Sequence, residues 1–158
     1  LQWTLARAAR WAKIDLELPV RAVFSTDLSD IEYRGFLVQP EIAYQHDNFL
    51  ETDSKLKLGL SAIFADEVLQ DYFYEVPGRF ATARRRAYDA DSGYLGSKLQ
   101  LSLRRPLTNR FKLLIGANLH YHGGAANEDS PLFSEDVTAA AGLGLIWSFY
   151  QSDRKVSE

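Results

Sequence analysis

Two histidines, His120 and His122, are the residues of this sequence most suited to chemistry. Residues two apart on a β-strand share one face, so the pair could hold two positions of a metal ion. A third ligand could come from one of three residues, although no spacing requires it: Glu128, Asp129 or His46. We favour the simpler interpretation that His120, His122 and Asn118 form a polar hydrogen-bond network, and we predict no metal site.

The same histidines could instead activate a serine nucleophile with a carboxylate or Asn118 as the orienting group. The candidate nucleophiles are Ser102, Ser130 and Ser134. None of them stands in a recognised nucleophile motif, and no glycine-rich phosphate loop is present. We therefore predict no catalytic residue, no cofactor and no enzymatic activity.

The strongest concentration of charge is a cluster of four arginines: Arg79, Arg84, Arg85 and Arg86. Guanidinium groups can bind phosphates through two parallel hydrogen bonds. The alternative is a solvated loop whose arginines pair with Glu75, Asp89 and Asp91. Aromatic residues at 72–74 lie beside this cluster and could anchor at an interface or pack the loop inward.

Composition limits the classes of protein to which the chain can belong. The 158 residues are 46% hydrophobic and 25% charged, which is typical of one folded domain. A net charge of −3 provides no basic field for nucleic acid, so we predict no nucleic-acid partner. Cysteine is absent, which excludes disulfides and thiolate zinc sites. No run of about eighteen apolar residues occurs, so the sequence predicts no membrane-spanning helix.

The dominant pattern is alternation of apolar with polar or small residues, the period of a β-strand whose faces meet different surroundings. In 137–149 one face is wholly apolar, whereas the other is small or polar apart from Ile146. The pattern predicts about six strands, at 14–22, 31–46, 55–64, 95–104, 111–122 and 137–149. Residues 1–10 fit either a strand or a short helix.

The strand at 31–46 is irregular, and a bulge near 35–38 would restore its alternation. Pro19 and Pro40 interrupt predicted strands, where a proline normally marks an edge or a bulge. The connections also alternate in length: 106–109 and 48–54 are short, and 67–93 and 124–136 are long. In an up-and-down antiparallel sheet, both long connections then fall at one end.

Alternation alone fits a soluble barrel as well as a membrane barrel. Three features favour the membrane: the strands are at or above the roughly nine to eleven residues of a crossing, aromatic residues lie at the ends of the apolar rows, and many charges share the other face. Since six strands cannot close such a barrel, we expect 1–158 to be a single domain forming the C-terminal part of a longer barrel, with a polar tail at 150–158.

Several motifs, in order, resemble one family. They are Leu58-Gly-Leu-Ser-Ala-Ile-Phe-Ala-Asp66, Asp71-Tyr-Phe-Tyr-Glu-Val76, Tyr88-Asp-Ala90 with Gly93, Leu107-Thr-Asn-Arg-Phe-Lys-Leu113, and Asp129-Ser-Pro-Leu132 leading into Ala141-Gly-Leu-Gly-Leu145. Together they resemble the MipA/OmpV (MltA-interacting protein) family over residues 20–149. Residues 150–158 depart from it, because family members usually end near a terminal aromatic residue.

The resemblance implies a bacterial outer-membrane barrel that acts as a scaffold between a murein transglycosylase and a penicillin-binding protein. Other members imply an adhesin as an alternative, and a small-solute pore and a lipid hydrolase remain alternatives of other classes. We expect contacts with outer-membrane lipid, with the arginine cluster binding lipopolysaccharide and with Asn118, His120 and His122 in the barrel lumen.

Overall fold

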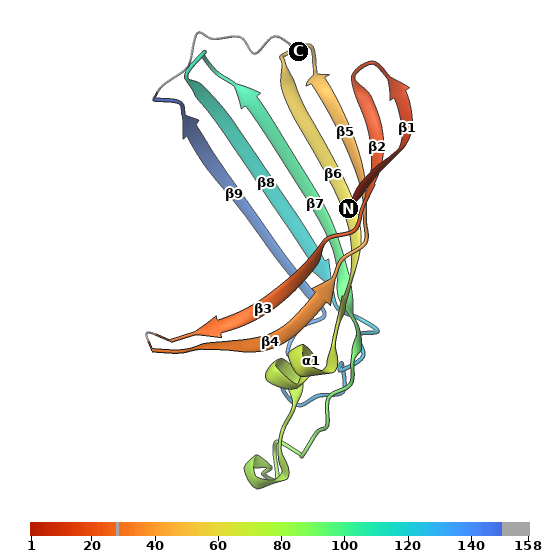
Figure 1. Cartoon of the computed structure of the whole chain (residues 1–158), viewed down its shortest axis with the longest axis vertical. Helices are drawn as coiled ribbons and strands as arrows, with labels where there is room; N and C mark the ends of the chain where they lie inside the picture. The colour runs from red at the N-terminus through yellow and green to blue at the C-terminus, as the bar shows by residue number, and fades with distance from the viewer. Residues whose placement is uncertain (28, 150–158) are drawn as a thin grey trace.

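The computed structural model describes residues 1–27 and 29–149, without the side chains of 7–9. Within this part, nine strands form one antiparallel sheet (Figure 1). They are β1 (Gln2–Ala9), β2 (Ala12–Glu17), β3 (Val20–Thr26), β4 (Ile31–Val38), β5 (Glu41–Phe49), β6 (Ser54–Ala65), β7 (Gly93–Pro106), β8 (Phe111–Tyr121) and β9 (Val137–Trp147). Between β6 and β7 lie helix α1 (Glu67–Tyr74) and a short 3-10 helix (Gly78–Phe80). The predicted all-β, antiparallel class is confirmed.

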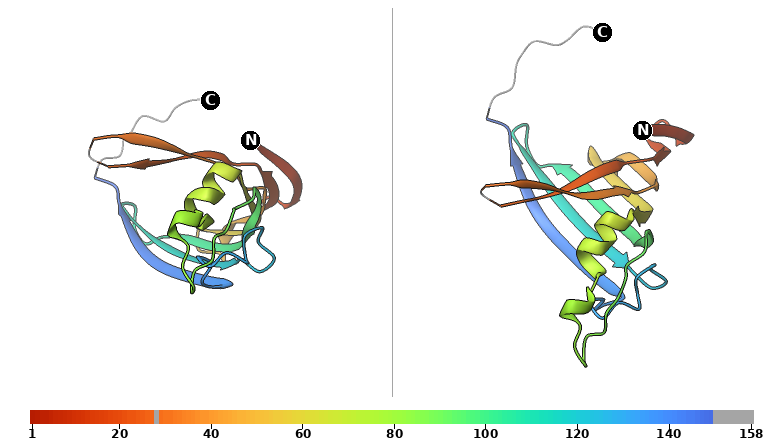
Figure 2. Two further views of the ribbon diagram at one scale, coloured as in Figure 1. Left: turned by 90° about the horizontal axis from the view of Figure 1, so that it is seen from below. Right: turned by 60° about the horizontal axis from the view of Figure 1, so that its bottom comes forward.

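The sheet runs in the order β1-β2-β5-β6-β7-β8-β9, while β4 pairs with β3 and, over two residues, with β6. The sheet is curved and does not close, and the β3–β4 hairpin runs across its open side (Figure 2). No helix in the described residues has the length and hydropathy needed to cross a membrane.

Prolines account for two of the three strands that the structure has beyond the predicted six. The predicted strands 14–22 and 31–46 are each divided where a proline stands, at Pro19 and at Pro40. Pairing continues in the same register on both sides of the break, and the Gln39 amide donates to the Pro19 carbonyl at 3.0 Å. The two breaks therefore lie side by side and bend one long hairpin. The remaining additional strand is β1, which forms from residues 1–10, the segment that fitted either a strand or a helix.

The predicted irregularity of β4 lies at Arg34, which has no partner in the β3 register, one residue before the expected stretch 35–38. Its neighbour Gly35 has a φ of 110°, a conformation that residues with a Cβ rarely adopt. A Cβ there would also collide with the Asp66 carboxylate and the Leu69 backbone. Glycine at this position thus allows α1 to pack against the hairpin.

The two faces of the sheet differ in chemistry along whole rows of paired residues. One row joins Leu16, Ile42, Leu60, Leu99, Leu119 and Ala139. The adjacent row joins Glu17, Glu41, Ser61, Lys98, His120 and Thr138 on the other face. We call the first the apolar face and the second the concave face. On the apolar face Leu60 is 59% exposed, whereas Ser61 on the concave face is 4% exposed.

The ends of the sheet differ as the connection lengths predicted. The short connections β1–β2, β5–β6 and β7–β8 lie at one end. The long connections 66–92 and 122–136 and the projecting β3–β4 hairpin lie at the other end (Figure 1). We call these the turn end and the loop end.

Candidate functional site: the concave face

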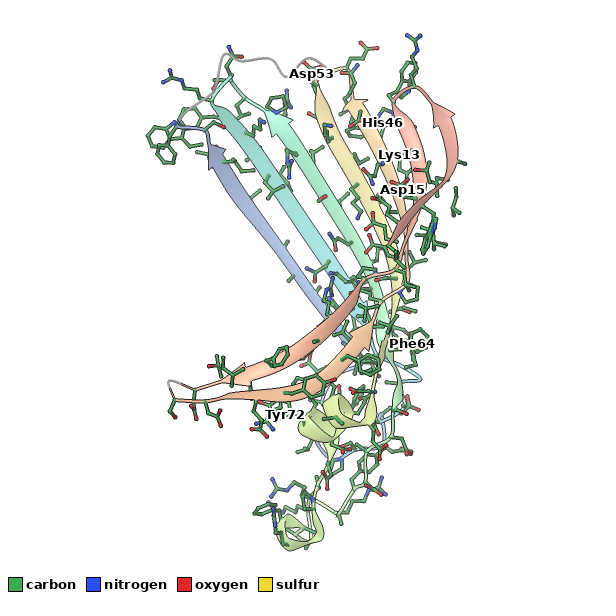
Figure 3. The ribbon with its side chains drawn as sticks, in the orientation of Figure 1. Lys13, Asp15, His46, Asp53, Phe64 and Tyr72 are labelled. Carbon is green, nitrogen blue, oxygen red and sulfur yellow. The ribbon has the colours of Figure 1, made fainter. Side chains whose placement is uncertain are left out.

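The Asp15 carboxylate is the centre of the polar contacts on the concave face. Its side chain is fully buried, and Figure 3 shows it on the same strand as Lys13. Four groups from three strands surround it. Its partners are Lys13 Nζ at 2.7 Å, Gln2 Nε2 at 2.9 Å, Thr4 Oγ1 at 2.8 Å and Gln45 Nε2 at 2.9 Å. A buried carboxylate requires this degree of compensation, because desolvation disfavours its charge.

Lys57 on β6 joins two further carboxylates to this surface. Its Nζ donates to Glu17 at 3.2 Å and lies 2.9 Å from Glu41 Oε1. That oxygen accepts no hydrogen bond of good geometry, so the second contact is an ion pair only. Gly59 makes room for it, because a Cβ at this position would lie 2.7 Å from Glu41 Oε1.

The contacts continue toward the β3–β4 hairpin. Arg21 Nη1 donates to Gln39 Oε1 at 2.8 Å, and Gln39 Nε2 donates to Ser61 Oγ at 2.9 Å. We call the whole set the polar wall: Gln2, Thr4, Lys13, Asp15, Glu17, Arg21, Gln39, Glu41, Gln45, Lys57 and Ser61. Alternation in the sequence indicates that these side chains share a face, but only strand pairing brings them into contact.

The structure places Asn118 and His120 on the concave face of β8, opposite Gln100 and Lys98 of β7. The His120 and His122 rings stack with centroids 6.0 Å apart, and His122 Nδ1 lies 2.9 Å from the Leu95 carbonyl, to which it can only donate. Neither Asn118 nor His120 makes a side-chain hydrogen bond to any described residue. Asn118 and His120 therefore make no hydrogen bond with the polar wall, and strand β7 lies between them and Ser61, the nearest wall residue in their row.

The alternative chemistries of the histidines receive no support from their surroundings. His46 lies on the apolar face, opposite Leu56, and not beside His120. The described residues contain no group of three or more potential metal ligands. Ser130 Oγ donates to the Tyr74 carbonyl at 2.7 Å, and none of the three candidate serines hydrogen-bonds a histidine within the described part of the chain.

The arginine cluster lies at the loop end, in the exposed segment 78–87 of the 66–92 connection. Arg85 Nη2 donates to the Phe80 carbonyl at 3.0 Å, and Arg86 Nη2 donates to the Asp129 carbonyl at 2.8 Å. Arg79 lies over the Phe80 ring at 4.9 Å. Among the described residues, no arginine of the cluster forms an ion pair with Glu75, Asp89 or Asp91. The described residues therefore do not show the carboxylate pairing that the solvated-loop alternative requires.

Buried polar contacts hold the two long connections together. Asn127 is 1% exposed; its side chain accepts from the Asp91 amide at 3.0 Å and donates to the Asp91 carbonyl at 2.8 Å. The Tyr88 hydroxyl also donates to it, and burial, with Asp129 and Asp91 nearby, raises the pKa of Tyr88. The loop end is thus a folded unit.

Helix α1 connects this unit to the hairpin. Asp66 caps the helix by accepting from the Leu69 amide at 3.2 Å, and the same oxygen accepts from the Phe36 amide of β4 at 3.0 Å. Arg34 lies over the Tyr72 ring at 4.5 Å, where the hairpin passes α1 (Figure 3). One carboxylate and one cation–π contact therefore fix the bent hairpin against the helix.

The family model described as MltA-interacting protein MipA matches residues 1–149, nearly all of the chain. The chain matches no curated protein and no solved structure.

Proposed function

Because the chain belongs to the MltA-interacting protein MipA family, we propose that it is a non-enzymatic scaffold of the bacterial cell envelope, located in the outer membrane. The observation that carries the membrane assignment is the inverted distribution of polarity over the sheet. Ile42 and Leu60 are 54% and 59% exposed, whereas Glu41 and Asp15 are 7% and 0% exposed. A soluble domain buries its apolar residues instead, because water excludes them.

The dimensions of the sheet support this proposal. Strands β6, β7, β8 and β9 have 12, 14, 11 and 11 residues, enough for tilted strands to cross a bilayer core of about 30 Å. At the turn end, Phe111 stacks on Trp147 with ring centroids 5.8 Å apart. Aromatic rings at the end of an apolar row favour the lipid–water interface.

For partners, we propose a murein transglycosylase of the MltA type and a penicillin-binding protein. The family's name refers to MltA. Long connections normally face outward in outer-membrane barrels. In that orientation the turn end faces the periplasm, where murein enzymes act. We also propose that 1–158 is a single β-barrel domain. Its expected polar tail at 150–158 lies outside the described residues.

Two further proposals concern individual residues. At the loop end, Arg79, Arg84, Arg85 and Arg86 are exposed and free of carboxylate partners among the described residues, which suits contact with lipopolysaccharide phosphates. On the concave face, Asn118, His120 and His122 would form part of a polar lumen.

Single-cysteine labelling tests the orientation of the faces, and the chain has no native cysteine to interfere. Leu99→Cys and Gln100→Cys form a matched pair, because the two residues are adjacent on β7 and point to opposite faces. A fluorophore at 99 should be quenched by brominated lipid, and one at 100 by an aqueous quencher. Equal or reversed quenching would refute the membrane assignment.

A pull-down tests the scaffold role separately. Full-length protein in liposomes should retain a purified MltA-type transglycosylase. Replacing the exposed β5–β6 turn at 50–53 with Gly-Ser should weaken retention if the partner binds the turn end. Shortening the 81–86 segment at the loop end is the control. Failure of the intact protein to bind the transglycosylase would contradict the recruitment proposal.

A small-solute pore is the second candidate, favoured by the hollow concave face. One hollow of about 410 Å³ lies against Ser102, Gly116, Asn118, Gly142 and Gly144. Planar-bilayer conductance distinguishes a pore from a closed scaffold, since only the pore gives discrete current steps.

A further inference from the structure

A second hollow on the concave face carries an unusual excess of positive charge. It encloses about 330 Å³ near the turn end and is lined by residues of β2, β5, β6, β7 and β8. Its basic residues are Lys13, Lys55, Lys57 and Arg104. Asp47 is the one carboxylate among the residues that line it, and Gln45 and Ser102 add neutral polar groups.

The three lysines are each matched by a carboxylate, but unequally. Lys13 and Lys57 contact buried or partly buried acids, at 2.7 Å from Asp15 and 2.9 Å from Glu41. Lys55 lies 3.1 Å from Asp47, and these two side chains are 67% and 59% exposed. An exposed pair of this kind contributes little free energy, so Lys55 can exchange Asp47 for another anion.

In contrast to the lysines, Arg104 has no carboxylate partner among the described residues. It lies directly opposite Lys55 in the β6–β7 register, and its neighbour on β8 is Leu114. Like charges that face each other across two strands destabilise a sheet. The Arg104 side chain makes no hydrogen bond or ion pair with any described residue. The hollow therefore contains a cation whose counter-charge the described chain does not provide.

We propose that this hollow is a binding site for a small anion bearing phosphate or carboxylate groups. The Arg104 guanidinium binds two oxygens of the anion, and Lys55 neutralises it from the facing strand. Ser102 and Gln45 supply neutral hydrogen-bond donors beside it. The site faces the concave side, away from the proposed lipid contact, and does not depend on recruitment of a partner protein.

Calorimetric titration tests the proposal on full-length protein in detergent at low ionic strength. Inorganic phosphate and succinate serve as separate probes, because they distinguish phosphate from carboxylate ligands. Arg104→Gln should weaken binding by about tenfold or more, the effect of losing charge-assisted hydrogen bonds. Arg105→Gln is the matched control: it removes the same charge from the next residue, which points to the apolar face opposite Leu113. Its affinity should be unchanged.

Binding of either probe that Arg104→Gln alone weakens supports the site, and the probe that binds identifies the ligand class. Absence of saturable binding by both probes overturns it, as does an equal loss in both variants, which would indicate a general charge effect. Circular dichroism checks that the variants fold. If Arg104→Gln fails to fold, Lys55→Gln decides: a weakening of severalfold supports the site, and unchanged affinity refutes it.

Discussion

At the scale of single residues, the polar wall depends on the Asp15 carboxylate. We expect Asp15→Asn to lower the free energy of unfolding by about 2–3 kcal/mol, because it removes the charged acceptor of several hydrogen bonds in a buried position. Urea unfolding in micelles measures the change. Asp53→Asn removes the same charge from an exposed turn whose φ of 53° suits asparagine, and should leave stability unchanged. Equal effects of the two substitutions would contradict this role of Asp15.

Gly59 is a second residue with a specific spatial task. Gly59→Ala should cost about 1–2 kcal/mol, because the added Cβ displaces the Glu41 carboxylate from Lys57. In Gly116→Ala, the control on the same face, the Cβ meets nothing within 4 Å. The penalty of Gly59→Ala should disappear in a Glu41→Ala background, which a double-mutant cycle measures. A penalty that persists there would show another cause.

At the scale of elements, the hairpin is bent at Pro19 and Pro40 and fixed against α1. Gly35→Ala should release it, because residue 35 combines a φ of 110° with close contact to Leu69. We expect faster hydrogen exchange of the Phe36 amide, which donates a hydrogen bond to Asp66 in the native structure. Gly78→Ala, in open space, is the control. Unchanged exchange at Phe36 would contradict the proposed fixation.

Helix α1 should also respond to pH. Burial raises the pKa of Asp71 from 3.8, and the carboxylates of Asp89, Asp66 and Asp91 raise it further. The folded state therefore binds this proton more tightly than the unfolded state does. The stability of the loop end should fall as the pH rises from 3.8 through the raised pKa. Asp71→Asn should flatten this dependence. The rate of proteolysis in the 66–92 connection, measured over a range of pH, tests it. If Asp71→Asn leaves the pH dependence unchanged, groups other than Asp71 cause it.

At the scale of the whole molecule, the orientation of the sheet in lipid decides which substitutions it tolerates. Leu99→Arg places a charge on the apolar face and should cost about 2–4 kcal/mol of folding free energy in liposomes, the range for arginine near the bilayer midplane. Gln100→Arg, one residue along β7, should fold normally. The folded fraction recovered in liposomes measures both. Equal recovery would contradict the lipid-facing assignment of Leu99.

The sequence predicted the faces and the ends of this molecule. Alternation places Leu60 and Ser61 on opposite sides of β6 whatever their partners, because successive side chains of a strand point in opposite directions. Connection length indicated the loop end in the same way. Pro19 and Pro40 were visible as interruptions, but the bend they produce depends on their lying side by side in a paired hairpin.

The contacts across the concave face required the tertiary structure. Asp15 meets Gln45, and Glu17 meets Lys57, because β2 lies beside β5 and β5 beside β6. The sequence predicts a network at Asn118, His120 and His122, whereas the polar wall forms across β1, β2, β3, β5 and β6, with Gln39 between β4 and β5. A strand fixes locally which way each side chain points. Strand order and register, set by pairing between distant segments, decide which side chains meet.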